Sequence, residues 1–139
     1  MNKIVFTISI IIFLFQFNSG IAQLDSIMER CASHLDINYV SDGQQYKALL
    51  NGDEVAEFYT TFYGGSTYRL VGYGGMAKGN LIFSVYDKSR NLLYSNQDYN
   101  NAPYWDLKFN STVDCIIEAK LDSKNLSSGF AIMLIGFKQ

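Results

Sequence analysis

The chain of 139 residues contains few of the side chains that enzymes and metal sites use. It has one histidine (His34), two cysteines, one tryptophan and one proline. Zinc sites need several nitrogen or sulfur ligands, so this set argues against zinc. A Ser-His-acid or Cys-His centre would have to use His34, which we expect near the end of a helix as a surface or capping residue. We therefore predict no enzyme, no bound metal and no cofactor.

Blocks of like charge are also absent. The 11 basic and 13 acidic residues give a net charge of −2 and are scattered along the chain. Nucleic acids and anionic membranes both require a basic face, so we expect neither as a partner. The acidic residues do not form a calcium site either. Asp98 stands among amide side chains, whereas calcium takes about six to eight oxygen ligands, several of them carboxylates.

The one long hydrophobic run lies at the N-terminus. Lys3 is followed by the apolar segment 4–17 and by a small-residue cleavage site, Gly-Ile-Ala, at 20–22. This pattern is typical of a secretory signal peptide. The run is shorter than the roughly 20 residues that a membrane-spanning helix needs. We predict that residues 1–22 are removed and that the mature protein is secreted or periplasmic, without membrane insertion after signal cleavage. An uncleaved anchor is the alternative.

The remaining residues, 23–139, have the length of a single domain. From residue 44 onward apolar and polar side chains alternate with period two, which predicts half-buried strands. The pairs Asn51-Gly52 and Gly64-Gly65 supply hairpin turns between them. The segment 130–137 is apolar on both faces and is expected at the centre of a sheet. Strands are predicted at 44–50, 55–63, 67–73, 81–86, 92–95, 104–109, 113–121 and 130–137.

A single helix is predicted before the strands, over residues 24–35. Its apolar side chains recur at helical spacing and form one stripe. A helix of this length is not stable alone, so the stripe must pack on the sheets, where it would close one end. The stripe consists of Leu24, Ile27, Met28, Cys31 and Leu35.

The two cysteines, Cys31 and Cys115, both fall on predicted apolar faces. In an exported protein an even number of cysteines favours a disulfide. A bridge between helix and sheet would stabilise the fold by about 4 kcal/mol on loop-closure arguments. Two buried free thiols are the alternative.

Two runs in the middle of the chain resemble a known family. The run GNLIFSVYDKSRNLLYS (79–95) alternates, reaches Tyr-Asp, turns through polar residues and returns, as in the middle hairpin of bacterial pre-peptidase C-terminal domains. The run FYTTFYGGSTYRLVGYG (58–74) resembles the hairpin before it. The resemblance covers residues 44–137 and implies an all-β, jelly-roll-like antiparallel β-sandwich of about eight strands, used as an accessory or binding module. The chain departs from the family at Ile82 and Ser84, where members often carry acids.

Aromatic residues are abundant, with ten tyrosines and ten phenylalanines. Strand alternation places Phe58, Phe62, Phe83, Trp105 and Phe109 on core faces. It leaves a set of tyrosines on the opposite faces or in a polar loop, where rigid amphipathic rings suit ligand binding. The alternative is that cross-strand tyrosine pairs stabilise a solvated sheet face. The predicted binding residues are Tyr59, Tyr63, Tyr86, Tyr99 and Tyr104.

These observations favour a secreted, non-catalytic binding module with a carbohydrate or protein ligand. A structural or assembly subunit of the bacterial cell envelope is the alternative, since sheet edges or the tyrosines could contact a partner. A hydrolase fits least, because nothing fixes two acids at a defined separation.

Overall fold

The computed structural model describes residues 19–138, which form eight strands, one α-helix and one short 3-10 helix. Of the predicted signal peptide, residues 1–22, the part up to residue 18 lies outside the described residues. The elements are α2 (Ser19–Ala32), β1 (Tyr39–Asn51), β2 (Val55–Phe62), β3 (Thr67–Gly74), β4 (Leu81–Asp87), β5 (Leu92–Ser95), η2 (Asn96–Tyr99), β6 (Tyr104–Lys108), β7 (Val113–Leu121) and β8 (Ser128–Lys138).

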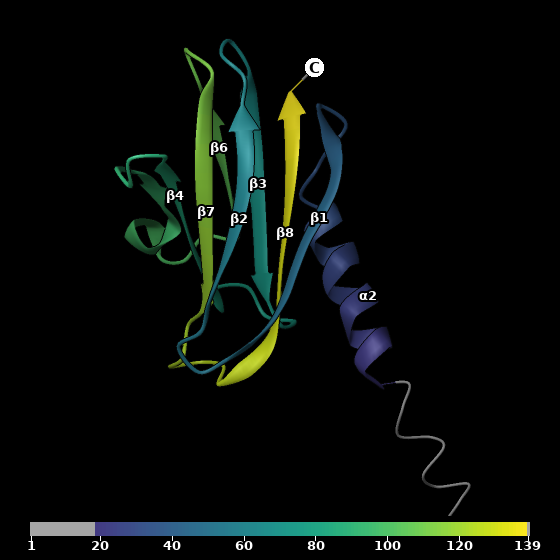
Figure 1. Ribbon diagram of the computed structural model, residues 1–139. Coiled ribbons are helices and arrows are strands. Elements are labelled where there is room, and N and C mark those ends of the chain that lie inside the picture. The colour runs from purple at the N-terminus through teal and green to yellow at the C-terminus, as the bar shows by residue number, and fades with distance from the viewer. Residues whose placement is uncertain (1–18, 139) are drawn as a thin grey trace, which may run out of the picture.

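The strands form two four-stranded sheets that pack face to face (Figure 1). Sheet A has the order β1-β8-β3-β6 and sheet B the order β2-β7-β4-β5, and every pair of neighbours is antiparallel. This order places the first strand beside the last and the second beside the seventh, as in a jelly roll. The structure confirms the predicted fold class, an all-β sandwich with one N-terminal helix.

The main core lies between the sheets and follows the strand alternation. Phe62, Phe83, Ile117 and Met133 point inward and are almost completely buried. β8 lies between β1 and β3, which confirms the central position predicted from its two apolar faces. A strand at that position has apolar side chains on both faces, so the outer face of sheet A also needs a cover.

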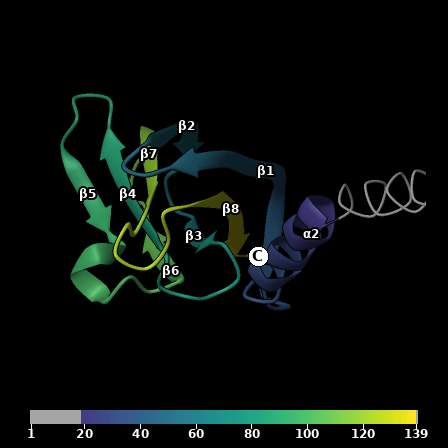
Figure 2. The same ribbon diagram turned by 90° about the horizontal axis from the view of Figure 1, so that it is seen from below.

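Helix α2 provides that cover. Ile27 and Cys31 are fully buried against Val71 and Ile132 on the outer face of sheet A. The predicted stripe packs on the sheet, but the predicted helix bounds, 24–35, are wrong, because the helix runs over Ser19–Ala32 and Leu35 lies after it. The helix also packs along the sheet and does not close an end of the sandwich. Figure 2 shows α2 beyond β1 and β8, on the side away from β4 and β5.

The chain leaves α2 through a turn that still contacts the sheet. Leu35 follows the helix and packs over Gly136 of β8. A Cβ atom at position 136 would lie 2.7 Å from Leu35 Cδ2, so a side chain there would displace Leu35. The absence of a side chain at Gly136 therefore allows the end of the stripe to seat on the sheet.

The predicted disulfide between Cys31 and Cys115 is wrong. Both cysteines are free and buried. Cys31 lies between α2 and the outer face of sheet A, whereas Cys115 of β7 points into the core between the sheets. Sheet A therefore separates the two sulfur atoms. Burial raises the pKa of the Cys31 thiol to about 12 and that of Cys115 to about 11, so both stay protonated at neutral pH.

Candidate functional site

The five tyrosines predicted to bind do not share one face. Tyr59 and Tyr86 both point outward on sheet B, where each is the cross-strand partner of Ile116. They form a row with that isoleucine between them. Tyr63 lies just after β2, in the turn that leads to β3. The other two belong to separate clusters at the opposite edge and on sheet A.

Tyr99 belongs to an aromatic stack at the edge of the sandwich. Its ring centroid is 4.2 Å from that of Trp105 and 5.8 Å from that of Tyr94. The short helix η2 carries Tyr99 over the end of β5, and the ring covers the two more buried rings. The stacking accounts for the position of Tyr99, although about half of its surface stays exposed.

Tyr104 belongs to a polar cluster around Arg69 on the outer face of sheet A. Arg69 donates two hydrogen bonds to Asp106, at 2.7 and 2.9 Å, and contacts Asp36 Oδ2 at 3.3 Å. Its guanidinium carbon is 4.2 Å from the ring centroid of Tyr39 and 4.9 Å from that of Tyr104. Tyr104 thus forms part of a structural cation–π arrangement.

His34 links this polar cluster to the helix. Its Nε2 atom lies 2.7 Å from Tyr73 Oη, and its carbonyl oxygen accepts a hydrogen bond from Arg69 Nη1 at 3.0 Å. Its ring also packs at 4.9 Å from the ring of Tyr104. Burial and the nearby Arg69 charge both lower the pKa of His34, so the imidazole is neutral at pH 7. These contacts connect the segment after α2 to β3 and β6.

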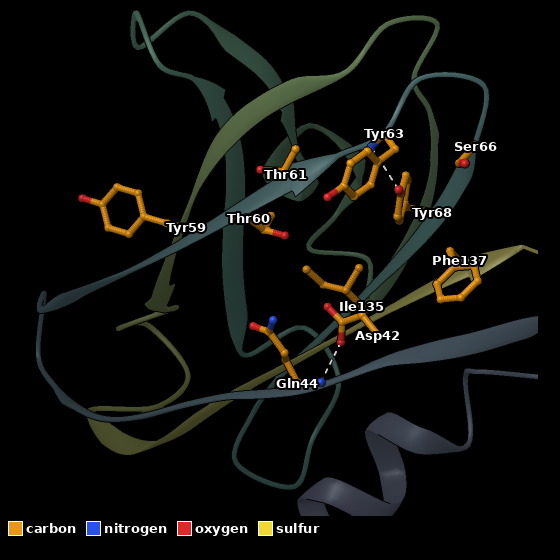
Figure 3. A pocket seen from close by; sticks show the side chains of 10 residues that line it. All are labelled: Asp42, Gln44, Tyr59, Thr60, Thr61, Tyr63, Ser66, Tyr68, Ile135 and Phe137. Carbon is orange, nitrogen blue, oxygen red and sulfur yellow. Dashed lines mark hydrogen bonds between the residues drawn. The ribbon is translucent and has the colours of Figure 1, made fainter.

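A different feature forms a concave surface. β1 and β2 are joined by the turn at Gly52, but they belong to different sheets and diverge as they leave it (Figure 1). A cleft of about 670 Å³ lies between them, open to solvent. Its lining side chains are shown in Figure 3: Asp42, Gln44, Tyr59, Thr60, Thr61, Tyr63, Ser66, Tyr68, Ile135 and Phe137.

The cleft has a buried apolar floor and an exposed aromatic rim. Ile135 and Tyr68 are buried beneath it. Tyr63 is 63% exposed at the rim, where Phe137 of β8 also lies. Tyr59 is 66% exposed, but its ring points away from the other lining side chains in Figure 3, and its hydroxyl donates to Glu57 Oε2 at 2.8 Å. The backbone N–H of Tyr63 donates to Tyr68 Oη at 3.0 Å, which fixes the turn at the rim. Two of the five predicted tyrosines, Tyr59 and Tyr63, therefore line this cleft.

Asp42 is the charged residue of the cleft lining, and a β-bulge places it there. The pairing of β1 with β8 shifts between Ser41 and Gln45, and Gly43 takes a φ of +81°. A bulge re-aims the side chains of the strand that contains it. The Asp42 carboxylate accepts a 2.9 Å hydrogen bond from the Gln44 backbone N–H (Figure 3). Burial raises its pKa, and it forms no ion pair with any residue in 19–138.

The sequence prediction missed Asp42, because it began this strand at residue 44. The observable signal was the pair Asp42-Gly43, a turn-type dipeptide directly before an alternating strand. A glycine within a strand pattern indicates a bulge, and the neighbouring side chain is then re-aimed.

The other acidic residues form no metal site in the described part of the chain. Asp98, the acid considered for calcium, is exposed on η2. Within residues 19–138 no three His, Cys, Asp or Glu side chains gather closely enough to hold a metal ion. In the same part of the chain, no helix has the length and apolar character to cross a membrane.

Comparisons with known proteins support the fold. No family model and no curated protein sequence matches the chain. Among solved structures, it is similar to Aeromonas hydrophila PliG, a periplasmic lysozyme inhibitor of g-type lysozyme. The two superpose with a TM-score of 0.53 over 68% of this chain and 85% of PliG, at 11% sequence identity. The likeness at this identity shows a shared β-sandwich.

Proposed function

We propose that this chain is an exported, non-catalytic module that binds another protein through the cleft between β1 and β2. The observation that carries the proposal is the composition of the cleft. It combines an apolar floor, an exposed ring at Tyr63, and a half-buried carboxylate at Asp42 that forms no ion pair within residues 19–138. Exposed aromatic anchors beside a concave surface are typical of protein-binding sites.

The fold likeness supports a protein ligand over a carbohydrate. PliG is, by its description, a periplasmic inhibitor of g-type lysozyme, and it has the same sandwich. We therefore propose a g-type lysozyme as the partner and the periplasm or the cell exterior as the location. The resemblance of residues 44–137 to pre-peptidase C-terminal domains stays a prediction; an accessory binding role in a secreted protein agrees with the same proposal.

Calorimetric titration of the mature chain (residues 23–139) with a g-type lysozyme tests the proposal, alongside an assay of cell-wall lysis. We expect binding and loss of lysis. Tyr63→Ala should weaken binding by tenfold or more, about the effect of removing one aromatic anchor. Tyr99→Ala is the matched control, because Tyr99 is similarly exposed but lies in the edge stack away from the cleft lining.

Thermal unfolding of both variants shows whether they stay folded. Absence of binding and of inhibition at tens of micromolar, about the limit for a specific inhibitor, would reject g-type lysozyme as the partner. Binding that is weakened by Tyr99→Ala and unchanged by Tyr63→Ala would move the site from the cleft to the edge stack.

A further inference from the structure

We propose that the cleft receives an extended segment of the partner protein that carries an arginine or lysine. The cation would pair with Asp42, and the backbone of the segment would add to the free edge of β2. This inference rests on the proposed function and specifies the chemistry of the partner.

The charge of the cleft indicates a cationic side chain. Five ion pairs within residues 19–138 use Asp36, Glu57, Asp106, Asp114 and Glu118. Asp42 takes part in none of them, although it is half-buried and lies beside the apolar floor. No lysine or arginine of residues 19–138 lines the cleft. An incoming cation would therefore neutralise a carboxylate that has lost part of its hydration without a compensating charge.

The free edge of β2 indicates an extended backbone. β2 pairs with β7 in one unbroken register from Val55 to Phe62, and no other strand of residues 19–138 is hydrogen-bonded to its other side. Alternate N–H and C=O groups of such an edge are available to a further strand. The facing edge strand, β1, is interrupted by the bulge at residues 42–44 and offers no regular edge there. We therefore place the added strand on β2, with its basic side chain directed toward Asp42.

The aromatic rim complements the same cation. A guanidinium binds favourably over a tyrosine ring, most of all when a carboxylate accepts its hydrogen bonds. The molecule contains this arrangement on its other sheet, where Arg69 lies against Tyr39 and Tyr104 and donates to Asp106. The cleft lining likewise contains an exposed tyrosine ring, Tyr63, and the carboxylate of Asp42, and the partner would supply the cation.

A peptide titration tests the inference without any lysozyme. The probe is acetyl-Thr-Val-Arg-Val-Thr-amide, added to the ¹⁵N-labelled mature chain and followed by amide chemical shifts. We expect shifts concentrated at residues 42–44 and 59–63. A second peptide with citrulline in place of arginine keeps the shape and removes the charge, and it should bind about tenfold more weakly.

Asp42→Asn should weaken the binding of the arginine peptide by a similar factor. Asp53 is an exposed acid in the β1–β2 turn, and Asp53→Asn should have no effect on binding. Equal binding of the two peptides, or no shifts at about 5 mM peptide, overturns the inference. Shifts at the same amides that depend on protein concentration alone would identify a second copy as the occupant, which also overturns it. If the peptide does not bind while lysozyme binding depends on Tyr63, the proposed function stands without this mechanism.

Discussion

Arg69 connects its own strand, β3, to two segments that are distant in sequence, β6 and the segment after α2. It holds Asp106 of β6 through two hydrogen bonds, Asp36 after the helix, and the carbonyl of His34. Its side chain is only 15% exposed, compared with 50% for Arg90, which bridges Glu57 and Glu118 on sheet B. A shielded ion pair with hydrogen bonds is worth more than an exposed one, so the two arginines should differ in their effect on stability.

We predict that Arg69→Met lowers the free energy of unfolding by about 1–3 kcal/mol, because Asp106 loses its charged hydrogen-bond donors. Methionine keeps much of the apolar stem, so the loss reports mainly on the guanidinium. Urea denaturation measures it, with Arg90→Met as the control, for which we expect a much smaller loss. Equal losses for the two variants would show that the burial of Arg69 contributes nothing.

The ionised carboxylate of Asp42 should lower the stability of the fold at neutral pH, because burial raises its pKa above the ordinary value of 3.8. A carboxyl with a raised folded-state pKa opposes folding when ionised, and this cost disappears as the pH falls and the group is protonated in both states. Asp42→Asn keeps the Oδ1 acceptor for the Gln44 N–H. We predict a higher melting temperature for this variant at pH 7 and no difference from wild type well below pH 3.8.

Asp36→Asn should change the melting temperature at pH 7 in the opposite direction. A hydrogen bond from the Asn38 backbone N–H is the largest cause that lowers the pKa of Asp36, and Arg69 lowers it further. This carboxylate stabilises the fold above its unfolded pKa, and the stabilisation is lost as the pH falls. Its replacement should therefore lower the melting temperature at pH 7. A destabilised Asp42→Asn variant at pH 7 would contradict the assignment of a desolvated carboxylate.

At the scale of elements, α2 contributes through a narrow stripe. Ile27 is completely buried against sheet A, whereas Glu29 of the same helix is exposed. We predict that Ile27→Ala lowers the free energy of unfolding by about 2–4 kcal/mol through lost contacts and a cavity. Glu29→Ala should change it little, which separates packing from helix propensity. Chemical denaturation measures both, and an unchanged Ile27→Ala variant would show that the helix is not docked in solution.

Most strands were predictable because they alternate, the last strand because its segment 130–137 is apolar on both faces, and the helix because its stripe is regular. Alternation assigns a side chain to one of two faces, but it does not say which sheet contains the strand. For that reason Tyr59 and Tyr104 had the same outward pattern although they lie on different sheets. The same limit explains the incorrect disulfide. Cys31 and Cys115 both lie on apolar faces, and only the jelly-roll order shows that sheet A separates them.

The candidate site was predictable only in part, for a related reason. Tyr59 and Tyr63 were identified from their outward phase. Their cleft depends on the divergence of β1 and β2 into different sheets and on the bulge at Asp42. Both features arise from tertiary pairing, since a bulge is defined by the partner strand.

At the scale of the whole molecule, sheet A is shared by two apolar clusters. Along β8, Ala131, Met133 and Ile135 point into the core between the sheets, while Ile132 and Leu134 point toward α2. β3 is shared in the same way. Opening either strand therefore disrupts both clusters. In the described part of the chain, α2 is held by one cluster, and β2 has a hydrogen-bonded strand on one side only.

This arrangement predicts an order of hydrogen exchange. Amides of β3 and β8 should exchange last, with the free energy of global unfolding, because they open only when both clusters are lost. Amides of α2 and β2 should exchange sooner, through local openings that leave sheet A intact. Hydrogen exchange followed by mass spectrometry on the mature chain measures this order. The Ile27→Ala substitution should accelerate the exchange of α2 amides more than that of β2 amides. Exchange of α2 and β8 at one common rate would instead show that the helix and the sandwich unfold only as a single unit.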